Sequence, residues 1–285
     1  MPQVFNSFFN SVEGNEGDLC KYPVRLDTYG CGCQHNCGYC YARSLLAFRG
    51  MWNPQSPAKA PVSEIRKVVA RKLRPGQVVR LGGMTDCFQP MERSAKVTYR
   101  TIQMLNARRV HYLVVTKNDL IATDPYLEVM DRDLAHVQVS VTTTDPDLSL
   151  RVEPGAPVPE RRIAAAERLQ AEGFDVSVRL SPFVPEFVDL DIINAIRCDK
   201  ILVEFLRVNT WIEKWLHGLP VDLTPYTHFN AGYKHLPLTM KRRLIQRVTG
   251  FREVTVCEDV PQHHQWWREN VNSNPDDCCN LYINR

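Results

Sequence analysis

Short apolar runs alternate with amphipathic stretches along the first 205 residues. The apolar runs are rich in β-branched residues and lack polar alternation, which is typical of strands covered on both faces. Six such strands are predicted, at Arg25–Tyr29, Gln77–Leu81, His111–Thr116, Val137–Thr142, Asp175–Leu180 and Lys200–Phe205. Helical patterns lie between them, at Ser63–Leu73, Arg93–Asn106, Pro125–Asp133, Pro159–Ala171 and Leu190–Ala195. This alternation predicts an α/β fold with a parallel sheet, and periodicity alone allows both an open doubly wound sheet and a barrel-like closure.

The pattern changes after Phe205. A Trp-bearing segment at Val208–Leu216 precedes a basic helix near Leu238–Val248, a short strand near Glu253–Val256 and a polar tail without clear periodicity. We therefore expect one α/β unit over residues 1–206, with a lead-in over 1–23. A C-terminal extension over 207–285, made of helices and a short strand, is expected to pack on that unit.

The composition is that of an ordinary globular protein. Of the 285 residues, 44% are hydrophobic and 24% charged, which argues against long disorder and a coiled coil. No apolar run is long enough to span a bilayer and the N-terminus lacks a signal-peptide pattern, so we expect a cytoplasmic protein without a membrane partner. The net charge of +3 allows a polyanionic partner without requiring one. Ten cysteines in a reducing compartment more often bind metal than form disulfides.

The most informative segment is LDTYGCGCQHNCGYCYAR, just after the first predicted strand. It places Cys33, Cys37 and Cys40 in a C-x3-C-x2-C pattern on one loop. Three thiolates so spaced can bind three corners of a cubane and leave the fourth iron open to a substrate. The alternative is a structural zinc site completed by Cys31, His35 or a remote cysteine, although zinc sites generally have two paired spacings. The pattern favours the iron–sulfur cluster.

These residues resemble the radical S-adenosylmethionine (SAM) superfamily. The blocks YGCGCQHNCGYCYAR, LGGMTDCFQPMER, VVTKNDLI and VEPGAPVPERRIAAAERLQAEGFDVSVRLSPFVP look like its spore photoproduct lyase-like branch. The resemblance covers roughly residues 24–205, and the C-terminal region matches nothing comparable. It implies a partial (β/α)6 TIM-type barrel with its chemistry at the C-terminal ends of the strands.

The resemblance also implies the cofactors and the reaction. Cys33, Cys37 and Cys40 would bind a [4Fe–4S] cluster, and SAM would chelate the open iron. A low-potential donor of the flavodoxin or ferredoxin kind would supply the electron that cleaves SAM. The resulting 5′-deoxyadenosyl radical would abstract hydrogen from a substrate.

Further cofactor-binding residues follow from their positions after the predicted strands. Gly82 and Gly83 match the place of the family's glycine motif, although a plain turn is the alternative. The other candidates lie at the ends of later strands or beside this motif: Thr85, Asp86, Thr116, Lys117, Ser140, Thr142 and Arg179. Arg179 beside Ser181 could bind SAM's carboxylate, and a structural salt bridge is an equal alternative.

Two residues are candidates for catalysis. Cys87 follows the Thr85–Asp86 pair near the expected mouth of the site and could return a hydrogen atom, as a cysteine does in spore photoproduct lyase. A buried structural cysteine is the simpler interpretation. Tyr99 is a candidate radical relay, as are Tyr39 and Tyr41.

DNA is a candidate partner because basic and aromatic residues gather near the C-terminus. The stretch LTMKRRLIQRVTGFR follows Lys234 and His235, and tryptophans 211, 215, 266 and 267 could stack on bases. The alternative is a solvated basic helix face with tryptophans in the core. Cys257, Cys278 and Cys279, with His263 and His264, could bind an auxiliary cluster or zinc, or could form part of a structural plug.

We therefore expect a radical SAM enzyme, a lyase or isomerase, acting on a thymine-derived base in DNA. It would repair DNA or remodel a hypermodified base, and would work in the host cytoplasm if it is virus-encoded. Modification of a peptide or small metabolite is the alternative within enzymes. A non-enzymatic iron–sulfur electron-transfer module is the alternative outside them, although such a module needs no SAM pocket.

Overall fold

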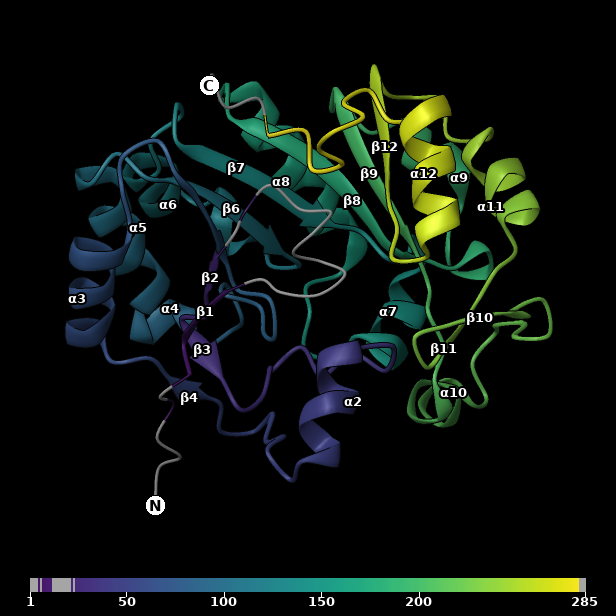
Figure 1. The fold of residues 1–285 in the computed structure, drawn as a ribbon, viewed down its shortest axis with the longest axis horizontal. Coiled ribbons are helices and arrows are strands. Elements are labelled where there is room, and N and C mark those ends of the chain that lie inside the picture. The colour runs from purple at the N-terminus through teal and green to yellow at the C-terminus, as the bar shows by residue number, and fades with distance from the viewer. Residues whose placement is uncertain (1–4, 6, 12–21, 23, 282–285) are drawn as a thin grey trace.

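The largest sheet of the computed structural model has eight strands in the order β1-β2-β5-β6-β7-β8-β9-β12 (Figure 1). The structure describes residues 5, 7–11, 22 and 24–281. Strand β1 is antiparallel to β2, and the neighbours from β2 to β12 pair in parallel. The strands are β1 (Phe9–Ser11), β2 (Val24–Leu26), β5 (Val78–Leu81), β6 (His111–Thr116), β7 (Ala135–Ser140), β8 (Asp175–Phe183), β9 (Lys200–Phe205) and β12 (Glu253–Cys257).

The prediction of a partial, unclosed barrel is confirmed. The six predicted strands, β2 to β9, lie side by side in chain order, as repeated right-handed crossovers require. β1 and β12 occupy the two edges and do not pair with each other within the described sheet. Two smaller antiparallel pairs flank it, β3 (Tyr29–Gly30) with β4 (Ala58–Lys59), and β10 (His228–Asn230) with β11 (Tyr233–His235).

The helices follow the predicted alternation, with one break and with two further helices, α2 and α7, that were not predicted. α8 begins at Pro159 and ends at Ala171, as predicted, and packs on β7 and β8. The predicted helix over Arg93–Asn106 is two helices, because Lys96 adopts a left-handed conformation with φ 48° and ends the first. The helices before Phe205 are α2 (Tyr41–Phe48), α3 (Val62–Lys72), α4 (Glu92–Ala95), α5 (Val97–Ala107), α6 (Asp124–Val129), α7 (Pro146–Val152), α8 and α9 (Leu190–Asn194), with 3-10 turns at Asp119–Ala122 and Pro185–Phe187.

The C-terminal segment supplies a strand of the main sheet. Its helices are α10 (Thr210–Leu216), α11 (Leu238–Ile245) and α12 (Pro261–Asn270), the last of which the sequence did not indicate. β12 pairs with β9 so that Cys257 lies opposite Glu204. Residues 278, 279 and 281 are then buried against side chains of the sheet, including Val78, Leu113 and Leu202. The segment after β9 therefore helps to fill the interior of the partial barrel.

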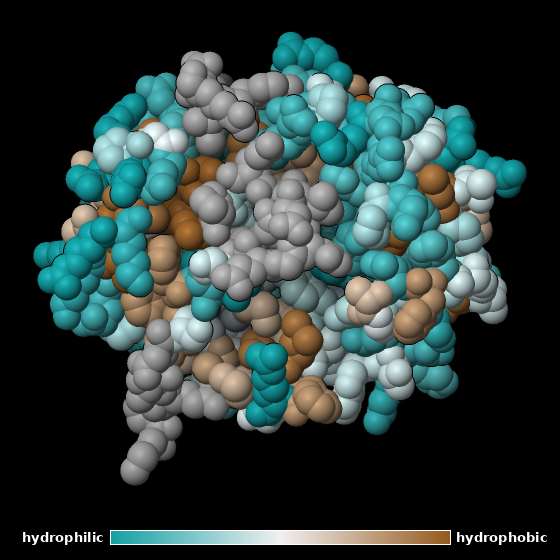
Figure 2. All heavy atoms as spheres, viewed as in Figure 1, coloured by the Kyte–Doolittle hydropathy of each residue, from teal (hydrophilic) through white to brown (hydrophobic). Residues whose placement is uncertain are grey.

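One face of the molecule shows apolar side chains near helix α2 (Figure 2). Leu45, Phe48 and Met51, on α2 and just after it, are 41%, 78% and 41% exposed. This helix starts directly after Cys40, whose sulfur accepts a hydrogen bond from the Arg43 amide and so caps it.

Candidate active site

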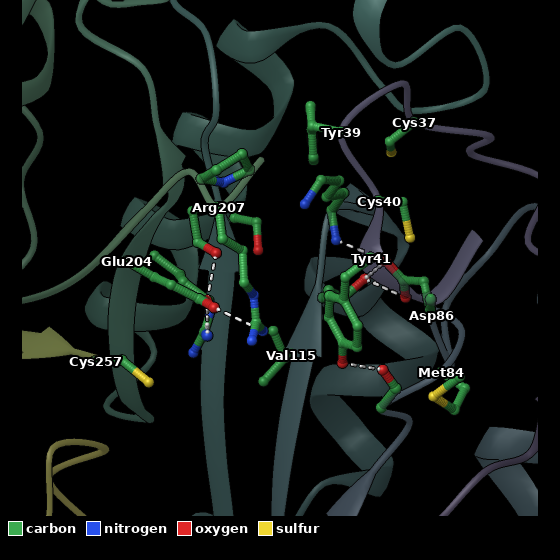
Figure 3. A pocket seen from close by; sticks show the side chains of 18 of the residues that line it. Cys37, Tyr39, Cys40, Tyr41, Met84, Asp86, Val115, Glu204, Arg207 and Cys257 are labelled. Carbon is green, nitrogen blue, oxygen red and sulfur yellow. Dashed lines mark hydrogen bonds and ion pairs between the residues drawn. The ribbon is translucent and has the colours of Figure 1, made fainter. Parts of the chain in front are cut away.

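A cavity of about 210 Å³ opens at the C-terminal ends of the parallel strands (Figure 3). Side chains at or just beyond the ends of β5, β6, β7, β8, β9 and β12 line it, together with the loop that carries Cys33, Cys37 and Cys40. Active sites of barrel enzymes form at this end of the strands, because each strand there delivers a side chain to one centre. The cavity is therefore the candidate active site.

The three cysteines of the predicted cluster motif all line the cavity. The loop turns tightly, with the Asn36 amide donating to the Cys33 carbonyl at 3.1 Å and the Cys40 amide donating to the Cys37 carbonyl at 3.4 Å. Cys33 and Cys37 are buried, and Cys40 is partly exposed. The short C-x3-C-x2-C spacing thus directs all three sulfurs toward one space.

The sulfur spacing distinguishes a cluster from a single metal ion. Two sulfurs bound to one zinc ion at about 2.3 Å can be no more than about 4.6 Å apart. Within the described residues, the one trio with ligand atoms all within 4.8 Å is His235, Glu258 and Asp259, so at least one pair of the three cysteine sulfurs is farther apart than 4.8 Å. Burial raises the pKa of Cys33 to about 12 and raises that of Cys37 well above its usual value. Because these buried thiols resist ionisation, they become thiolates only beside a cationic centre such as a metal. The residues fit an iron–sulfur cluster better than zinc.

The loop is held from one side by His35 and Asp86. The two His35 ring nitrogens contact the Gly155 carbonyl at 2.9 Å and the Asp86 carboxylate at 3.1 Å. A Cβ on Gly155 would lie 1.9 Å from the Gln34 carbonyl oxygen, so only glycine allows this approach. The backbone after α7 therefore supports the cysteine loop.

Asp86 joins three segments around the cavity. Its carboxylate accepts hydrogen bonds from the Thr116 hydroxyl at 2.8 Å and from the Lys117 and Phe88 amides, both at 2.8 Å. Burial acts to raise the Asp86 pKa, but the charge and hydrogen bond of His35, with these amides, lower it below its usual value. Asp86 thus stays ionised and positions the loop and the end of β6.

A buried ion pair contacts the cysteine loop through Tyr39. Glu153 and Arg162, both fully buried, are 2.6 Å apart, and the Tyr39 hydroxyl donates to the other oxygen of Glu153. The Lys117 ammonium lies 3.9 Å from Glu153 and 5.5 Å from the centre of the Tyr39 ring. Burial raises the pKa of Cys37 and Cys40, and the positive charge of Lys117 acts to lower it. Lys117 is thus a cation at the edge of the cysteine motif.

The structure brings most of the predicted cofactor-binding residues into the cavity and leaves two outside its lining. Thr142 donates to the Ser181 carbonyl at 3.0 Å, and its hydroxyl lies 3.1 Å from that of Tyr39, so it is a buried structural contact. Gly82 adopts φ +78° in a turn, where a Cβ would lie 2.7 Å from the Thr85 carbonyl oxygen. The predicted residues that do line the cavity are Gly83, Thr85, Asp86, Thr116, Lys117, Ser140 and Arg179.

Arg179 forms a structural ion pair, which was the predicted alternative to binding the SAM carboxylate. Its guanidinium donates to Glu204 at 2.5 Å and to Gln138 at 2.6 Å, and the Ser181 hydroxyl donates to the same Glu204 carboxylate at 2.8 Å. Burial acts to raise the Glu204 pKa, but the charges of Arg179 and Arg207 lower it to about 2. Arg179 therefore already has a carboxylate partner within the protein.

The two predicted catalytic residues lie away from the cavity lining. Cys87 is 0% exposed, and burial raises its pKa well above the usual value. Tyr99 packs edge-on against Tyr126, with its ring 5.5 Å from the Lys96 ammonium. Tyr39 and Tyr41 do line the cavity, and the Tyr41 hydroxyl donates to the Gly83 carbonyl at 2.8 Å.

Several lining residues were not predicted. Glu204 and Arg207 lie at and just beyond the end of the sixth predicted strand. Because strand ends face the site, their positions in the sequence could have identified them. Cys257, Cys278 and Cys279 also line the cavity, and only the pairing of β12 with β9 brings them there.

The predicted basic and aromatic surface is divided between core and solvent. Lys241 is fully buried and lies 2.5 Å from Glu258, and Trp267 is a core residue, so neither is available to DNA. The Arg242 guanidinium lies 4.3 Å from the centre of the Trp266 ring, and Trp211 is 43% exposed. The smaller exposed set still combines positive charge with aromatic rings.

Comparison with known proteins places this geometry in a family. Residues 28–198 match the family model described as the radical SAM superfamily. The chain belongs to the radical SAM superfamily. Members use a [4Fe–4S] cluster and SAM, in agreement with the predicted cofactors, and a solved spore photoproduct lyase mutant contains bound AdoMet.

Similar proteins occur in bacteria and archaea. An uncharacterised protein of Mycobacterium bovis is 30% identical over 253 residues, which cover 79% of this chain and 73% of that protein. An uncharacterised protein of Methanocaldococcus jannaschii is 26% identical over 166 residues, which cover 57% of this chain and only 61% of that protein.

Two solved structures have the same fold. Spore photoproduct lyase complexed with dinucleoside spore photoproduct has a TM-score of 0.62 at 13% identity, covering 93% of this chain and 78% of that one. Streptococcus suis SuiB bound to precursor peptide SuiA has a TM-score of 0.51 at 14% identity, covering 85% of this chain and 51% of that one. Across the described residues, none of the helices is both long and apolar enough to cross a membrane.

Proposed function

We propose that this radical SAM protein is an enzyme that abstracts hydrogen from a thymine-derived base in DNA. The reaction would be a lyase-type repair or the isomerisation of a hypermodified base. The observation that carries the proposal is the single cavity shared by Cys33, Cys37, Cys40 and the polar ends of the parallel strands. When bound to these cysteines, the cluster supplies the electron that cleaves SAM to methionine and a 5′-deoxyadenosyl radical.

The side chains of the cavity have separate tasks in this proposal. Cys33, Cys37 and Cys40 hold the cluster. Lys117 is the carboxylate partner for SAM, because its ammonium is next to the cysteine motif and only at 3.9 Å from Glu153, which pairs more closely with Arg162. Arg179 instead pairs directly with Glu204 at 2.5 Å. Gly83 also lines the cavity, and its backbone is the candidate contact for the SAM amino group.

A DNA substrate is supported by two observations. The fold similarity to spore photoproduct lyase extends over 93% of this chain, and that protein was solved with a dinucleoside spore photoproduct. Exposed Arg242 on α11 lies over Trp266 of α12, a combination that can contact phosphate and base. The similarity to a peptide-bound SuiB makes a peptide the competing substrate.

The test is an anaerobic assay of 5′-deoxyadenosine with iron–sulfur-reconstituted, dithionite-reduced protein. We expect deoxyadenosine formation to rise when damaged or base-modified DNA made from perdeuterated thymidine is added, and deuterium to appear in the deoxyadenosine. Cys40→Ala should lower formation at least about 100-fold, because even residues that only support a metal ligand contribute 10–100-fold in affinity. Cys198→Ser, which changes a buried cysteine outside the cavity, should retain activity.

The outcomes separate the candidate functions. Deoxyadenosine without deuterium, and at a rate indifferent to DNA, would contradict the DNA substrate and favour a peptide or metabolite. An absence of SAM cleavage by fully loaded protein would contradict the enzyme and leave an electron-transfer module.

A further inference from the structure

Helix α2 presents exposed apolar side chains beside the cysteine motif. Leu45 and Phe48 on α2, and Met51 just after it, are 41%, 78% and 41% exposed, and Arg49 is exposed as well. Leu45 is three residues before Phe48 and four before Arg49, so these side chains are neighbours on one face of the helix. We call these four residues the α2 surface (Figure 2). Exposed apolar side chains bordered by charge are typical of a site that binds another macromolecule.

The α2 surface is directly connected to the cysteine motif. Cys40 precedes the first residue of α2, and its sulfur accepts a hydrogen bond from the Arg43 amide at 3.4 Å. Because an α-helix rises about 1.5 Å per residue, Phe48 lies about 12 Å along the helix axis from Cys40. The rate of electron transfer between proteins falls steeply with distance. A donor that binds the α2 surface would therefore be close to the sulfurs of the motif.

The charge near α2 favours an acidic partner. The sequence has no acidic residue from position 28 to position 63, and in the same range it has Arg43, Arg49 and Lys59. Arg49 and Lys59 are exposed and form no ion pair within the part of the chain that the structure describes. Complementary charge steers two proteins into contact, so an acidic protein surface is the suitable counterpart.

Two other occupants fit the α2 surface less well. In a two-fold dimer, residues near the axis face their own copies, so a second copy of the chain would bring Arg49 close to Arg49. The basic and aromatic pair proposed to contact DNA, Arg242 and Trp266, belongs to α11 and α12. These helices lie at the upper right of Figure 1 and α2 lies at the bottom. DNA and a protein partner could therefore bind at the same time.

We propose that the α2 surface docks a reduced ferredoxin, a small acidic iron–sulfur protein that delivers one electron to the cysteine motif. The proposal rests on the proposed function, in which the cleavage of each SAM takes one electron. Whenever SAM is consumed, this electron must be replaced from outside the chain. The ferredoxin loses one electron, becomes oxidised and dissociates, and no bond or proton is exchanged at the α2 surface.

The test uses an oxidised plant-type [2Fe–2S] ferredoxin as the probe and measures its binding by isothermal titration calorimetry. Phe48→Asp/Arg49→Glu should weaken binding about 10-fold or more, because it removes an aromatic contact and reverses a complementary charge. Added salt should weaken binding to the wild type. Ile192→Asp/Arg71→Glu makes the same changes at exposed residues of α9 and α3, and should bind like the wild type.

A second measurement separates docking from the chemistry of the site. With NADPH, ferredoxin reductase and limiting ferredoxin as the electron source, Phe48→Asp/Arg49→Glu should form deoxyadenosine about 10-fold more slowly than the wild type, in parallel with its weaker binding. With dithionite, a small reductant that needs no docking surface, the two proteins should form it at the same rate.

Equal ferredoxin affinity of the wild type and Phe48→Asp/Arg49→Glu would overturn the proposal, as would a wild type that does not bind ferredoxin. A wild-type dimer that this variant dissociates, seen by sedimentation, would assign the α2 surface to a second copy instead. Loss of DNA binding in the variant would assign it to DNA. None of these results contradicts the proposed function, which dithionite tests without ferredoxin. Conversely, ferredoxin binding at the α2 surface without SAM cleavage in dithionite would contradict the proposed function alone.

Discussion

The two cysteine groups that face the cavity are anchored by different kinds of contact. The loop with Cys33, Cys37 and Cys40 rests on Glu153 and Arg162, whose side chains are 0% exposed. The segment with Cys278 and Cys279 is tied to α12 by Arg268 and Asp276, whose side chains are 44% and 72% exposed. Solvent screens exposed pairs strongly, whereas a buried charge depends wholly on its partner.

This difference indicates unequal local stability. The cysteine loop shares its anchors with the core, so opening it should require breaking buried contacts throughout that region. The contact of the C-terminal segment with α12 is an exposed ion pair and a hydrogen bond, although Cys278, Cys279 and Leu281 of the same segment are buried against the sheet. Contacts that are exposed to solvent open at lower free energy than those of the core. We therefore expect substitutions at the two anchors to differ several-fold in effect.

The largest expected effect is at Glu153. Glu153→Gln removes the charge that compensates buried Arg162, and we expect it to lower the free energy of unfolding by about 3–5 kcal/mol. Denaturant titration followed by circular dichroism measures this change. The double variant Glu153→Met/Arg162→Met is the control, because replacing both charges by apolar side chains should recover much of the loss. A loss below about 1 kcal/mol for Glu153→Gln would show that the loop does not depend on this ion pair.

Glu204 should give a pH-dependent effect of intermediate size. Burial opposes its ionisation, but Arg179, Arg207 and the Ser181 hydroxyl lower its pKa from 4.5 to about 2. A depressed carboxyl pKa stabilises the fold above the unfolded value, and this stabilisation, about 3 kcal/mol, is lost as the pH falls from about 4.5 to about 2. Glu204→Gln should therefore be destabilised at pH 7, with a difference from wild type that shrinks below pH 4.5.

The control for Glu204 is Glu64→Gln, which changes an exposed carboxylate paired with Lys67 and should have little effect at any pH. Unfolding free energies of the three proteins at several pH values give the comparison. A Glu204→Gln deficit that stays constant from pH 7 to pH 3 would contradict the assigned ionisation.

The sequence allowed the first cysteine group and the six central strands to be predicted. Cys33, Cys37 and Cys40 lie within eight residues of chain, so their convergence depends only on a local turn. The strands were visible because both faces of a parallel sheet are buried, which leaves continuous apolar runs.

The remaining features depend on contacts between distant segments. Cys257 reaches the cavity because β12 pairs with β9, and no local pattern specifies that neighbour. Arg179 could be placed at a strand end, but its pairing with Glu204 requires the adjacent strand. Lys241 belongs to a basic stretch in sequence, yet Glu258 pairs with it in the core. Local chemistry was therefore predictable where one segment suffices, and unpredictable where tertiary packing selects the partner.

The smallest expected effect is at the anchor of the C-terminal segment. Arg268→Ala removes the pair with Asp276 and the hydrogen bond from Arg268 Nε to the Pro275 carbonyl, and exposed pairs of this kind contribute about 0–1 kcal/mol. We expect a global unfolding free energy within about 1 kcal/mol of the wild type, but faster amide hydrogen exchange in residues 272–281, measured by mass spectrometry. Arg132→Ala, which breaks an exposed pair with Glu172 elsewhere on the surface, is the matched control and should leave exchange in 272–281 unchanged. A loss as large as that of Glu153→Gln would mean that both cysteine groups are anchored in one cooperative core, and the contrast between them would fail.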